Sequence, residues 1–383
     1  MRILLSGGGS GGHVFPLVAL ARALQNQILP AGESMEVYFV GPAHFPLDSL
    51  VAQKVKVFHI SAGKARRYAS ISNIFSPFFA FWGFIKALWI LWRVMPDAIF
   101  IKGGYGSVAV GVVAWLYRIP TLLHESDAVP GLANRILAGL ATRIAIAFEE
   151  AALLLPKSKT AVVGIPVREG ILAPPAEAPK FPDPKPVLLF LGGSQGAARL
   201  NATVAQILTQ ALPLYNIIHQ CGPKNLTAFK NELTRVFKID PDKTPGYRLV
   251  DQFSENDLGA ALKAADLVIS RAGASSIFEI SAARKPAILI PIHDSAQDHQ
   301  SRNAFDYSRA GAAEVIEETN LTPRLLLNEI NVLINDPPRR TAMVQGARQF
   351  FKPNASQILA QEVIKLVIGR LGGLQSRGEI KLA

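Results

Sequence analysis

The chain has 383 residues, of which 49% are hydrophobic, so it is long enough for two domains and too apolar to be disordered. Its single cysteine, Cys221, excludes an internal disulfide and argues against a zinc site built from thiolates. The net charge is +11, and residues 49–118 carry nine Lys or Arg against one acid, Asp97. Such a basic surface favours anionic partners, namely nucleic acid, phosphate ligands or anionic lipid, but ordinary solvated surface charge explains it equally well.

In the first half, short apolar runs alternate with glycine-rich loops and helical segments. The first run, residues 2–6, is too short for the apolar core of a secretory signal and is interpreted as a buried strand. It leads into glycines at 7–12 and a helical stretch at 16–27. Further strands are expected at residues 35–40, 55–60, 98–102 and 121–124. This succession predicts a parallel sheet with helices on both faces.

The pattern restarts after residues 174–186, which are rich in proline and charge and are typical of a linker. A strand at 187–191 precedes a second glycine loop at 192–197, in the place that the first loop takes in the first half. More strands are expected at residues 217–221, 247–250, 267–270 and 287–291. The predicted class is therefore α/β, with two Rossmann-like domains facing each other across a cleft. In such sheets ligands bind beyond the carboxyl ends of the strands, where the glycine loops lie.

The segment 71–95 is unusually apolar, and its only charges are Lys86 and Arg93. A transmembrane span is one interpretation, but Pro77 interrupts the run and a crossing would separate strands of one sheet. A buried core helix is another. We favour a helix that lies in the membrane interface, with the basic residues Lys64, Arg66 and Arg67 just upstream to meet lipid headgroups.

The first glycine loop is a candidate anion site, because glycines let a ligand approach the backbone and a helix N-terminus favours negative charge. It lacks the Gly-Lys-Ser/Thr of nucleotide triphosphatases and the acidic residue that dinucleotide binding requires after the second strand. His13 at its end is a candidate general base, with a purely structural histidine as the alternative. Ser194 in the second loop is a candidate diphosphate ligand, or the cap of a tight turn.

A third candidate lies at residues 270–279, where Ser275 and Ser276 stand near a helix start and Glu279 follows within about a turn. Glu279 is suited to accept hydrogen bonds from two neighbouring ribose hydroxyls, whereas the structural alternative is a helix-capping arrangement. The polar loop at 298–300 offers further hydrogen-bonding groups for sugar hydroxyls.

Taken together, the motifs resemble the bacterial MurG family of N-acetylglucosaminyl transferases. Any one of them is modestly specific, but seven in the family's order are very specific. They are GGGSGGHVFP (7–16), KGGYGS (102–107), HESDAVPGLANR (124–135), GIPVR (164–168), GGSQGA (192–197), SRAGASSIFE (270–279) and DHQSRNA (298–304).

The resemblance implies a GT-B fold and inverting transfer of N-acetylglucosamine from UDP-N-acetylglucosamine to the 4-hydroxyl of the N-acetylmuramoyl group of undecaprenyl-diphosphate-MurNAc-pentapeptide (lipid I), which gives lipid II for peptidoglycan synthesis. It implies an acceptor- and membrane-binding domain at 1–167, a UDP-sugar-binding domain at 168–352 and a helix at 353–370 that packs back on the first. No metal or other cofactor is expected. The expected location is peripheral, on the cytoplasmic side of the cell membrane and in contact with anionic lipid.

The resemblance also assigns site residues. The expected donor-site residues are Ser10, Gly11, Gly12, Asp127, Arg168, Ser194, Ala274, Ser275, Ser276, Ile277, Phe278, Glu279, His299 and Gln300. The acceptor and its diphosphate are expected at Gly103, Gly104 and Tyr105. The candidates for the catalytic base are His13 first, then Asp127 or Glu125. Asp127 stands where the family often has a neutral amide, so its role is the least certain to carry over.

Three other functions remain open from the sequence. Another GT-B transferase that acts on a membrane glycolipid would share the fold and differ in its acceptor. A nucleotide-binding membrane scaffold would bind donor without transfer. A nucleic-acid-binding protein is suggested by charge alone, without the interleaved basic and aromatic residues of single-strand binders, so we expect no nucleic-acid partner.

Overall fold

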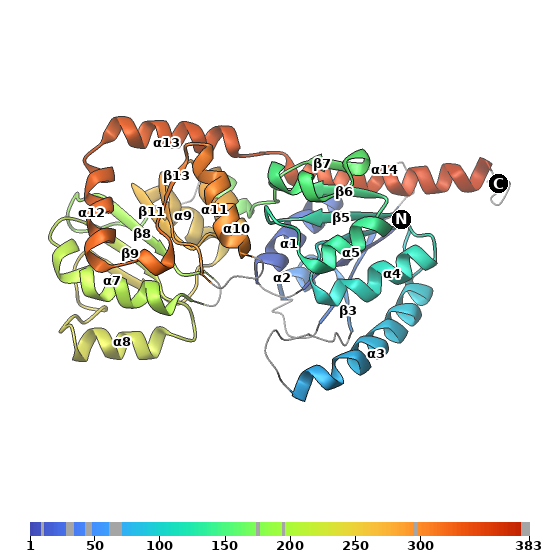
Figure 1. Cartoon of the computed structure of the whole chain (residues 1–383), viewed down its shortest axis with the longest axis horizontal. Helices are drawn as coiled ribbons and strands as arrows, with labels where there is room; N and C mark the ends of the chain where they lie inside the picture. The colour runs from blue at the N-terminus through green and yellow to red at the C-terminus, as the bar shows by residue number, and fades with distance from the viewer. Residues whose placement is uncertain are drawn as a thin grey trace. The chain divides into compact units, whose positions relative to one another are not determined.

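The protein was analysed as a computed structural model, which describes residues 1–8, 11–27, 34–42, 48–60, 71–173, 177–193, 196–293 and 298–376. Within these ranges, the side chains of residues 11–13, 48, 49, 71–77, 79 and 371–376 are not described. The chain divides into two compact units (Figure 1). Unit 1 comprises Met1–Pro166 and Asn354–Ala383, and unit 2 comprises Val167–Pro353.

Unit 1 is built on a seven-stranded parallel sheet in the order β3-β2-β1-β4-β5-β6-β7. Its strands are β1 (Arg2–Ser6), β2 (Glu36–Gly41), β3 (Lys56–His59), β4 (Ala98–Ile101), β5 (Thr121–Glu125), β6 (Arg143–Ile146) and β7 (Thr160–Val162). The register of β1 sets Leu5 beside Phe39 of β2 and Phe100 of β4.

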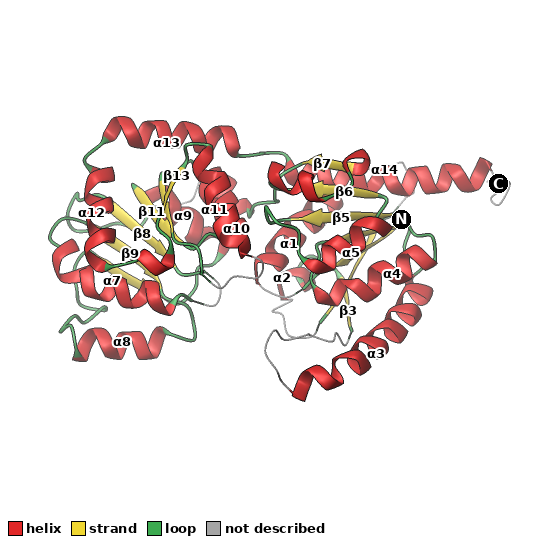
Figure 2. Ribbon diagram, viewed as in Figure 1, coloured by secondary structure: helices red, strands yellow, loops and turns green. Residues whose placement is uncertain are grey.

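The strands of unit 1 are apolar throughout because both faces of the sheet are buried. Ile3 and Leu5 point into one core, together with buried side chains of α1 (Gly11–Gln25) and α14 (Ala355–Ser376). Leu4 points into the opposite core, with buried side chains of α3 (Ile71–Val94), α4 (Val108–Leu116) and α5 (Leu132–Leu140). Helices therefore cover the two faces of one sheet, as Figure 2 shows. The shorter α2 (Asp48–Val51) contacts α1.

Unit 2 contains a six-stranded parallel sheet in the order β10-β9-β8-β11-β12-β13. Its strands are β8 (Val187–Leu191), β9 (Asn216–Gln220), β10 (Tyr247–Val250), β11 (Leu267–Ser270), β12 (Ala287–Leu289) and β13 (Ala313–Val315). Its helices are α6 (Glu169–Leu172), α7 (Ala198–Ala211), α8 (Leu226–Arg235), α9 (Glu255–Ala264), α10 (Ala274–Ala282), α11 (His299–Arg309), α12 (Pro323–Ile334) and α13 (Pro337–Phe350).

The helices of unit 2 present apolar stripes to this sheet. On α7, Leu200, Val204 and Leu208 are fully buried at the i, i+4 spacing of one helix face. Buried leucines of α12 complete the same core. Thr322 caps the start of α12 by accepting a hydrogen bond from the Leu325 backbone N–H, and Pro323 occupies its first turn.

The predicted α/β class with two parallel-sheet, Rossmann-like domains is confirmed. Three strands were not predicted, namely β6, β7 and β13, of which β7 and β13 are edge strands of only three residues. In the part of the chain that the structure describes, no helix combines the length and hydropathy needed to cross a membrane.

Candidate functional site

In unit 1, the loops after β1, β4 and β5 meet at one edge of the sheet because these strands are parallel neighbours. The hydroxyl of Ser6, at the end of β1, lies 3.2 Å from the hydroxyl of Ser107, which follows β4. Ser107 in turn donates to the Gly103 carbonyl oxygen over 3.0 Å. The sheet therefore gathers three of the predicted motifs at its carboxyl edge.

Gly103 and Gly104 have positive φ values of 98° and 89°, which residues with a side chain rarely adopt. A Cβ atom on Gly104 would lie 2.0 Å from the carbonyl oxygen of Gly8, in the loop after β1. A Cβ atom on Gly103 would overlap the side-chain amide of Asn134 in α5. Glycine is thus required here for the β4 loop to approach both neighbours, and Tyr105 begins the 3-10 turn η1 (Tyr105–Ser107) that follows.

Glu125 organises the loop after β5. Its Oε1 accepts hydrogen bonds from the backbone N–H groups of Ser126 (2.7 Å) and Asp127 (2.9 Å). Its Oε2 accepts from the backbone N–H of Gly131 (3.2 Å) and the side-chain amide of Asn134 (2.8 Å). Burial raises the pKa of this carboxyl, whereas the hydrogen bonds favour its ionised form. Both oxygens of Glu125 are therefore engaged in holding the loop.

Directly after β4, Lys102 is a buried lysine whose side chain joins the β4 and β5 loops. Its Nζ lies 2.9 Å from Nδ1 of His124 and donates to the hydroxyl of Ser126. On the other side of the imidazole, Nε2 lies 2.8 Å from the carbonyl oxygen of Gly164. Because only an N–H can satisfy that carbonyl, Nδ1 accepts from the ammonium and the imidazole is neutral. Burial lowers the pKa of Lys102 to about 8, against the opposing effect of Glu125 and Asp127.

In unit 2, Arg168 and Glu279 form a bidentate pair. The Arg168 Nε donates to Oε1 of Glu279 over 2.7 Å, and Nη2 donates to Oε2 over 3.0 Å. Both side chains are only 10% exposed, so the pair is largely shielded from water. It joins the N-cap of α6 to the middle of α10. The structure thus brings together two residues that the sequence predicted separately, 111 positions apart.

The N-terminus of α10 follows β11 without a side-chain cap. Its N-cap is Gly273, which makes no side-chain cap bond, so the alternative of a capping box is wrong. Ser275 and Ser276 are partly exposed in the first turn, whereas Ala274 is buried. Ile277 and Phe278 are fully buried, and the Phe278 ring lies 5.2 Å from the Phe350 ring. The side chains of Ile277 and Phe278 therefore pack in the core, whereas those of Ser275 and Ser276 are partly exposed beside the backbone N–H groups of the first turn.

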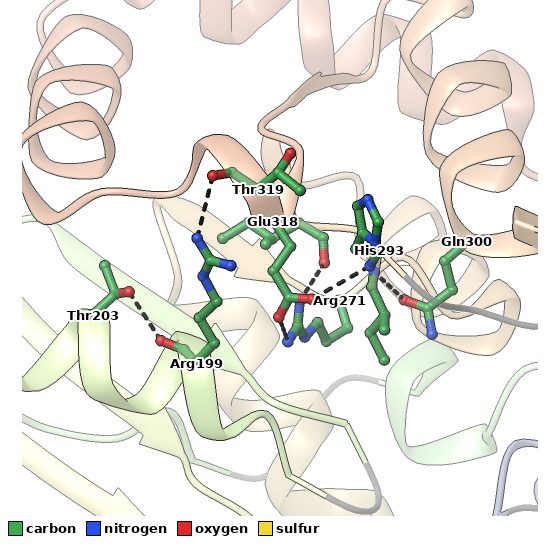
Figure 3. Close-up of polar contacts among 9 residues, drawn as sticks. Arg199, Thr203, Arg271, His293, Gln300, Glu318 and Thr319 are labelled. Atoms are coloured by element: carbon green, nitrogen blue, oxygen red, sulfur yellow. Dashed lines mark hydrogen bonds and ion pairs between the residues drawn. The ribbon is translucent and has the colours of Figure 1, made fainter.

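At the start of α11, Gln300 holds the loop after β12. Its Oε1 accepts from the backbone N–H of Ile292 over 3.2 Å (Figure 3). Nearby, Glu318 forms an ion pair with Arg271 and accepts from the backbone N–H of His293 over 3.3 Å. Arg271 also donates to the carbonyl oxygen of Ile290 over 3.2 Å. His299 begins α11 and is partly exposed.

Sequence reasoning quoted Lys102 and Arg271 within motifs but gave neither a role. Both directly follow an apolar strand, at the carboxyl edge where ligands bind, and both are nearly fully buried. A Lys or Arg directly after an apolar strand is therefore the sequence pattern that could have identified both residues. Glu318 carries no comparable signal, because its partner Arg271 lies 47 residues away.

For several predicted site residues, the structure describes either nothing or the backbone alone. Ser10 and Ser194 lie outside the described residues, as do Lys64, Arg66 and Arg67. Gly11, Gly12 and His13 form the first turn of α1, where the backbone alone is described. Among the residues that the structure describes, no three His, Cys, Asp or Glu side chains gather where they would hold a metal ion.

Comparison with known proteins relates both units to one family. Residues 3–146 match the glycosyltransferase family 28 N-terminal domain, and residues 187–359 match the glycosyltransferase family 28 C-terminal domain. A Bacillus cereus UDP-N-acetylglucosamine--N-acetylmuramyl-(pentapeptide) pyrophosphoryl-undecaprenol N-acetylglucosamine transferase is 37% identical over 340 residues, which is 87% of this chain and 91% of the relative. The enzyme of the same name from Clostridium kluyveri is 34% identical over 372 residues, or 96% of this chain and 98% of the relative.

Solved structures agree with this relationship. The crystal structure of Acinetobacter baumannii MurG is 28% identical, with a TM-score of 0.70 and coverage of 95% of this chain and 99% of that one. S. aureus MnaA, determined with UDP, has a TM-score of 0.69 with coverage of 97% and 98%. At 14% identity, the second similarity extends to the fold alone.

The close approach of the glycine loops yields a test of the fold at this edge. Replacing Gly104 with Ala places a side chain at a positive φ and against the Gly8 carbonyl, so we expect the free energy of unfolding to fall by about 2 kcal/mol or more. The control is Gly139→Ala in α5, where no atom lies within 4 Å of the new Cβ, and which is expected to be neutral or slightly stabilising. Urea denaturation measures both, and equal stability of the two variants would contradict the assigned loop contact.

Proposed function

Because the chain belongs to the family of UDP-N-acetylglucosamine--N-acetylmuramyl-(pentapeptide) pyrophosphoryl-undecaprenol N-acetylglucosamine transferases, we propose that it transfers N-acetylglucosamine from UDP-N-acetylglucosamine to lipid I and so forms lipid II for peptidoglycan synthesis. The observation that carries this proposal is identity of 34–37% sustained over both Rossmann-like units of a GT-B enzyme.

An assay of the purified chain with labelled UDP-sugars tests the proposal. We expect label from UDP-N-acetylglucosamine to enter lipid I, and little label to enter other membrane glycolipids. Efficient transfer to a different glycolipid, with lipid I inert, would favour the alternative GT-B transferase. Donor binding without transfer to any acceptor would favour a scaffold.

For the donor, the proposed site lies at the carboxyl edge of unit 2. The Arg168–Glu279 pair uses one lone pair on each carboxylate oxygen, so the carboxylate retains acceptor capacity for two neighbouring ribose hydroxyls. The N-terminus of α10 favours the negative diphosphate through its backbone N–H groups, with Ser275 and Ser276 beside them. His299, Gln300 and Ser194 belong to the same proposal for unit 2, and we also propose Ser10, Gly11, Gly12 and Asp127 of unit 1 as donor residues.

Replacing Glu279 with Gln keeps the side-chain size and removes the charge that both Arg168 and a ribose would bind. A charge-assisted hydrogen bond contributes roughly 1.5–3 kcal/mol, so we expect the KM for UDP-N-acetylglucosamine to rise about tenfold or more. The matched control is Glu314→Gln, which breaks the partly exposed pair with Arg339 elsewhere in unit 2 and leaves KM unchanged. An unchanged KM in Glu279→Gln would remove Glu279 from the donor site.

For the chemistry, inversion requires the acceptor 4-hydroxyl to attack the anomeric carbon from the face opposite UDP. A bond forms between that oxygen and the anomeric carbon, the bond from the anomeric carbon to the β-phosphate oxygen breaks, and UDP leaves with its electron pair. The hydroxyl proton passes to a base. The proposed acceptor site is the carboxyl edge of unit 1, where the Gly103–Gly104 turn lies beside the loop containing Asp127.

Two residues of this edge compete for the role of base. We expect His13→Ala to lower kcat about 10²–10⁴-fold, to abolish the acidic limb of the pH profile and to leave the Kd for UDP unchanged, because proton removal needs the unprotonated imidazole. Calorimetry with UDP and pH-dependent kinetics measure these effects. Survival of the limb in His13→Ala together with its loss in Asp127→Asn would assign the base to Asp127 instead.

For the membrane, α3 has two faces of opposite character. Ala87, Ile90, Leu91 and Val94 are buried in unit 1, so the helix is anchored to the sheet. Apolar side chains are exposed on its other face, on α4, which packs against α3, and on α5, which packs against α4. They are Phe78, Phe81, Trp82, Ile85, Trp89, Trp92, Trp115, Leu116, Leu132 and Ile136. We call these residues the apolar face.

Several features of the apolar face support peripheral binding to anionic lipid on the cytoplasmic side of the membrane. Trp89 and Trp92 are 55% and 66% exposed. Single exposed hydrophobic residues are common on protein surfaces, but a group of large ones on one helix face marks an interaction surface. The exposed Lys86 and Arg93 lie on the same helix, and Arg118 follows α4. Aromatic rings at headgroup depth with flanking cations are typical of interfacial helices. Binding to the membrane surface would bring the enzyme to its acceptor, because the lipid tail of lipid I is embedded in the membrane.

Polar substitution of the apolar face tests this part of the proposal. We expect the triple change Trp82→Ser, Trp89→Ser and Trp92→Ser to abolish flotation with anionic vesicles while the free energy of unfolding changes little, because all three rings face solvent. Binding of the wild type is expected to weaken with salt.

A matched control replaces three exposed apolar residues of unit 2 with serine, namely Leu214, Val236 and Val332. Flotation of this control is expected to equal that of the wild type. Undiminished flotation of the tryptophan variant would exclude the apolar face as the membrane-binding surface.

A further inference from the structure

Lys102 is the buried charge of unit 1 whose role the proposed chemistry leaves open. Its residue is 1% exposed, and it stands between β4 and the Gly103–Gly104 turn. A buried ammonium is unfavourable unless its hydrogen bonds and charge are compensated, so its presence at this edge calls for a function.

The hydrogen bonds of the Lys102 side chain lead to the end of β5 and to the loop that follows it. The ammonium donates to Nδ1 of His124 at 2.9 Å and to the hydroxyl of Ser126. His124 is fixed in turn by the Gly164 carbonyl oxygen at 2.8 Å, so it is a rigid acceptor. Ser126 is thereby tied to a side chain that does not belong to its own loop.

The side chain of Glu125 holds the backbone of the same segment. The carboxylate accepts from the backbone N–H groups of Ser126 and Asp127, whereas Lys102 holds the Ser126 side chain. The two charged residues therefore form a clamp on the dipeptide Ser126–Asp127, one at its backbone and the other at the Ser126 hydroxyl. A segment held at both its backbone and a side chain has less torsional freedom than one held at either alone.

The charges that face Lys102 are Glu125 and Asp127, and His124 is the neutral titratable group beside it. Burial raises the pKa of Glu125, and the ammonium opposes that rise, so it favours the ionised form that accepts four hydrogen bonds. Loss of the positive charge would therefore weaken both halves of the clamp.

We infer that Lys102 is a positioning residue for glycosyl transfer, which acts through Ser126 and Glu125 to hold Asp127 and the β5 loop in the arrangement that receives the acceptor. The inference rests on the proposed function and adds to it a requirement for a protonated lysine. Because burial brings the pKa of Lys102 to about 8, activity is expected to decline as the pH rises through that value.

Kinetics of Lys102→Met with UDP-N-acetylglucosamine and lipid I test the inference. Methionine has a similar length and no charge, so we expect kcat to fall about 10- to 100-fold with the KM for the donor unchanged. The alkaline limb with a midpoint near pH 8, present in the wild type, is expected to vanish in the variant. Lys285→Met is the matched control, because Lys285 is a partly buried lysine of unit 2 whose Nζ donates to the Lys263 carbonyl oxygen, and it is expected to keep both kcat and the limb.

Ser126→Ala provides a second variant that retains the lysine. It is expected to lower kcat less than Lys102→Met and to keep the alkaline limb, and the double variant is expected to be no slower than Lys102→Met alone. These outcomes require coupling through Ser126. If Lys102→Met does not fold, Ser126→Ala alone decides the matter, because a lowered kcat with the limb kept supports the inference and an unchanged kcat overturns it.

Each failure has its own signature. If the wild type transfers no sugar to lipid I, the proposed function is wrong and the inference falls with it. If the wild type is active and Lys102→Met retains its kcat, or its limb, Lys102 is a structural residue only. A fully additive double variant would likewise overturn coupling through Ser126.

Discussion

Parallel strand pairing is the constraint on which the functional arrangement depends. Because every strand of a unit points the same way, the loops after β1, β4 and β5 have to meet at one edge, as do those after β11 and β12 in unit 2. Meeting closely leaves no room for a Cβ, and that explains glycine at position 104, which faces the Gly8 backbone, and at position 103, which faces the Asn134 side chain. The parallel sheet thus brings the loops to one edge, and the glycines allow them to pack closely there.

The two edges use buried charge differently. In unit 2, Arg168 and Glu279 neutralise each other directly and keep acceptor capacity, which suits a neutral ribose. In unit 1, Lys102 donates to two neutral groups of the described residues, His124 in β5 and Ser126 in the loop that follows it. In the proposed function, the first arrangement belongs to the edge that binds the donor, and the second orders the edge that receives the acceptor.

Much of this architecture was predictable from the sequence, for physical reasons. Strands buried on both faces are continuous apolar runs, and residues 2–6 and 187–191 were therefore predicted with their observed bounds. Short edge strands such as β7 carry little apolar signal and were missed. The motifs located the edges of the sheets but not the partners of each side chain, because pairs such as Arg168 with Glu279 form only after folding. The assignment of Ile277 and Phe278 to the donor stays a prediction, and because helical periodicity directs both side chains into the core, it concerns their backbone groups.

The stereochemistry of the product is the most direct test of the central claim, which is inverting transfer by this chain. Lipid II formed by the purified protein from UDP-N-acetylglucosamine can be delipidated, and the coupling between H1 and H2 of the new sugar measured by NMR. A single in-line displacement predicts the large coupling of a β-linkage, in which both protons are axial. The small coupling of an α-linkage would contradict attack opposite the leaving UDP, and with it the roles assigned to both edges.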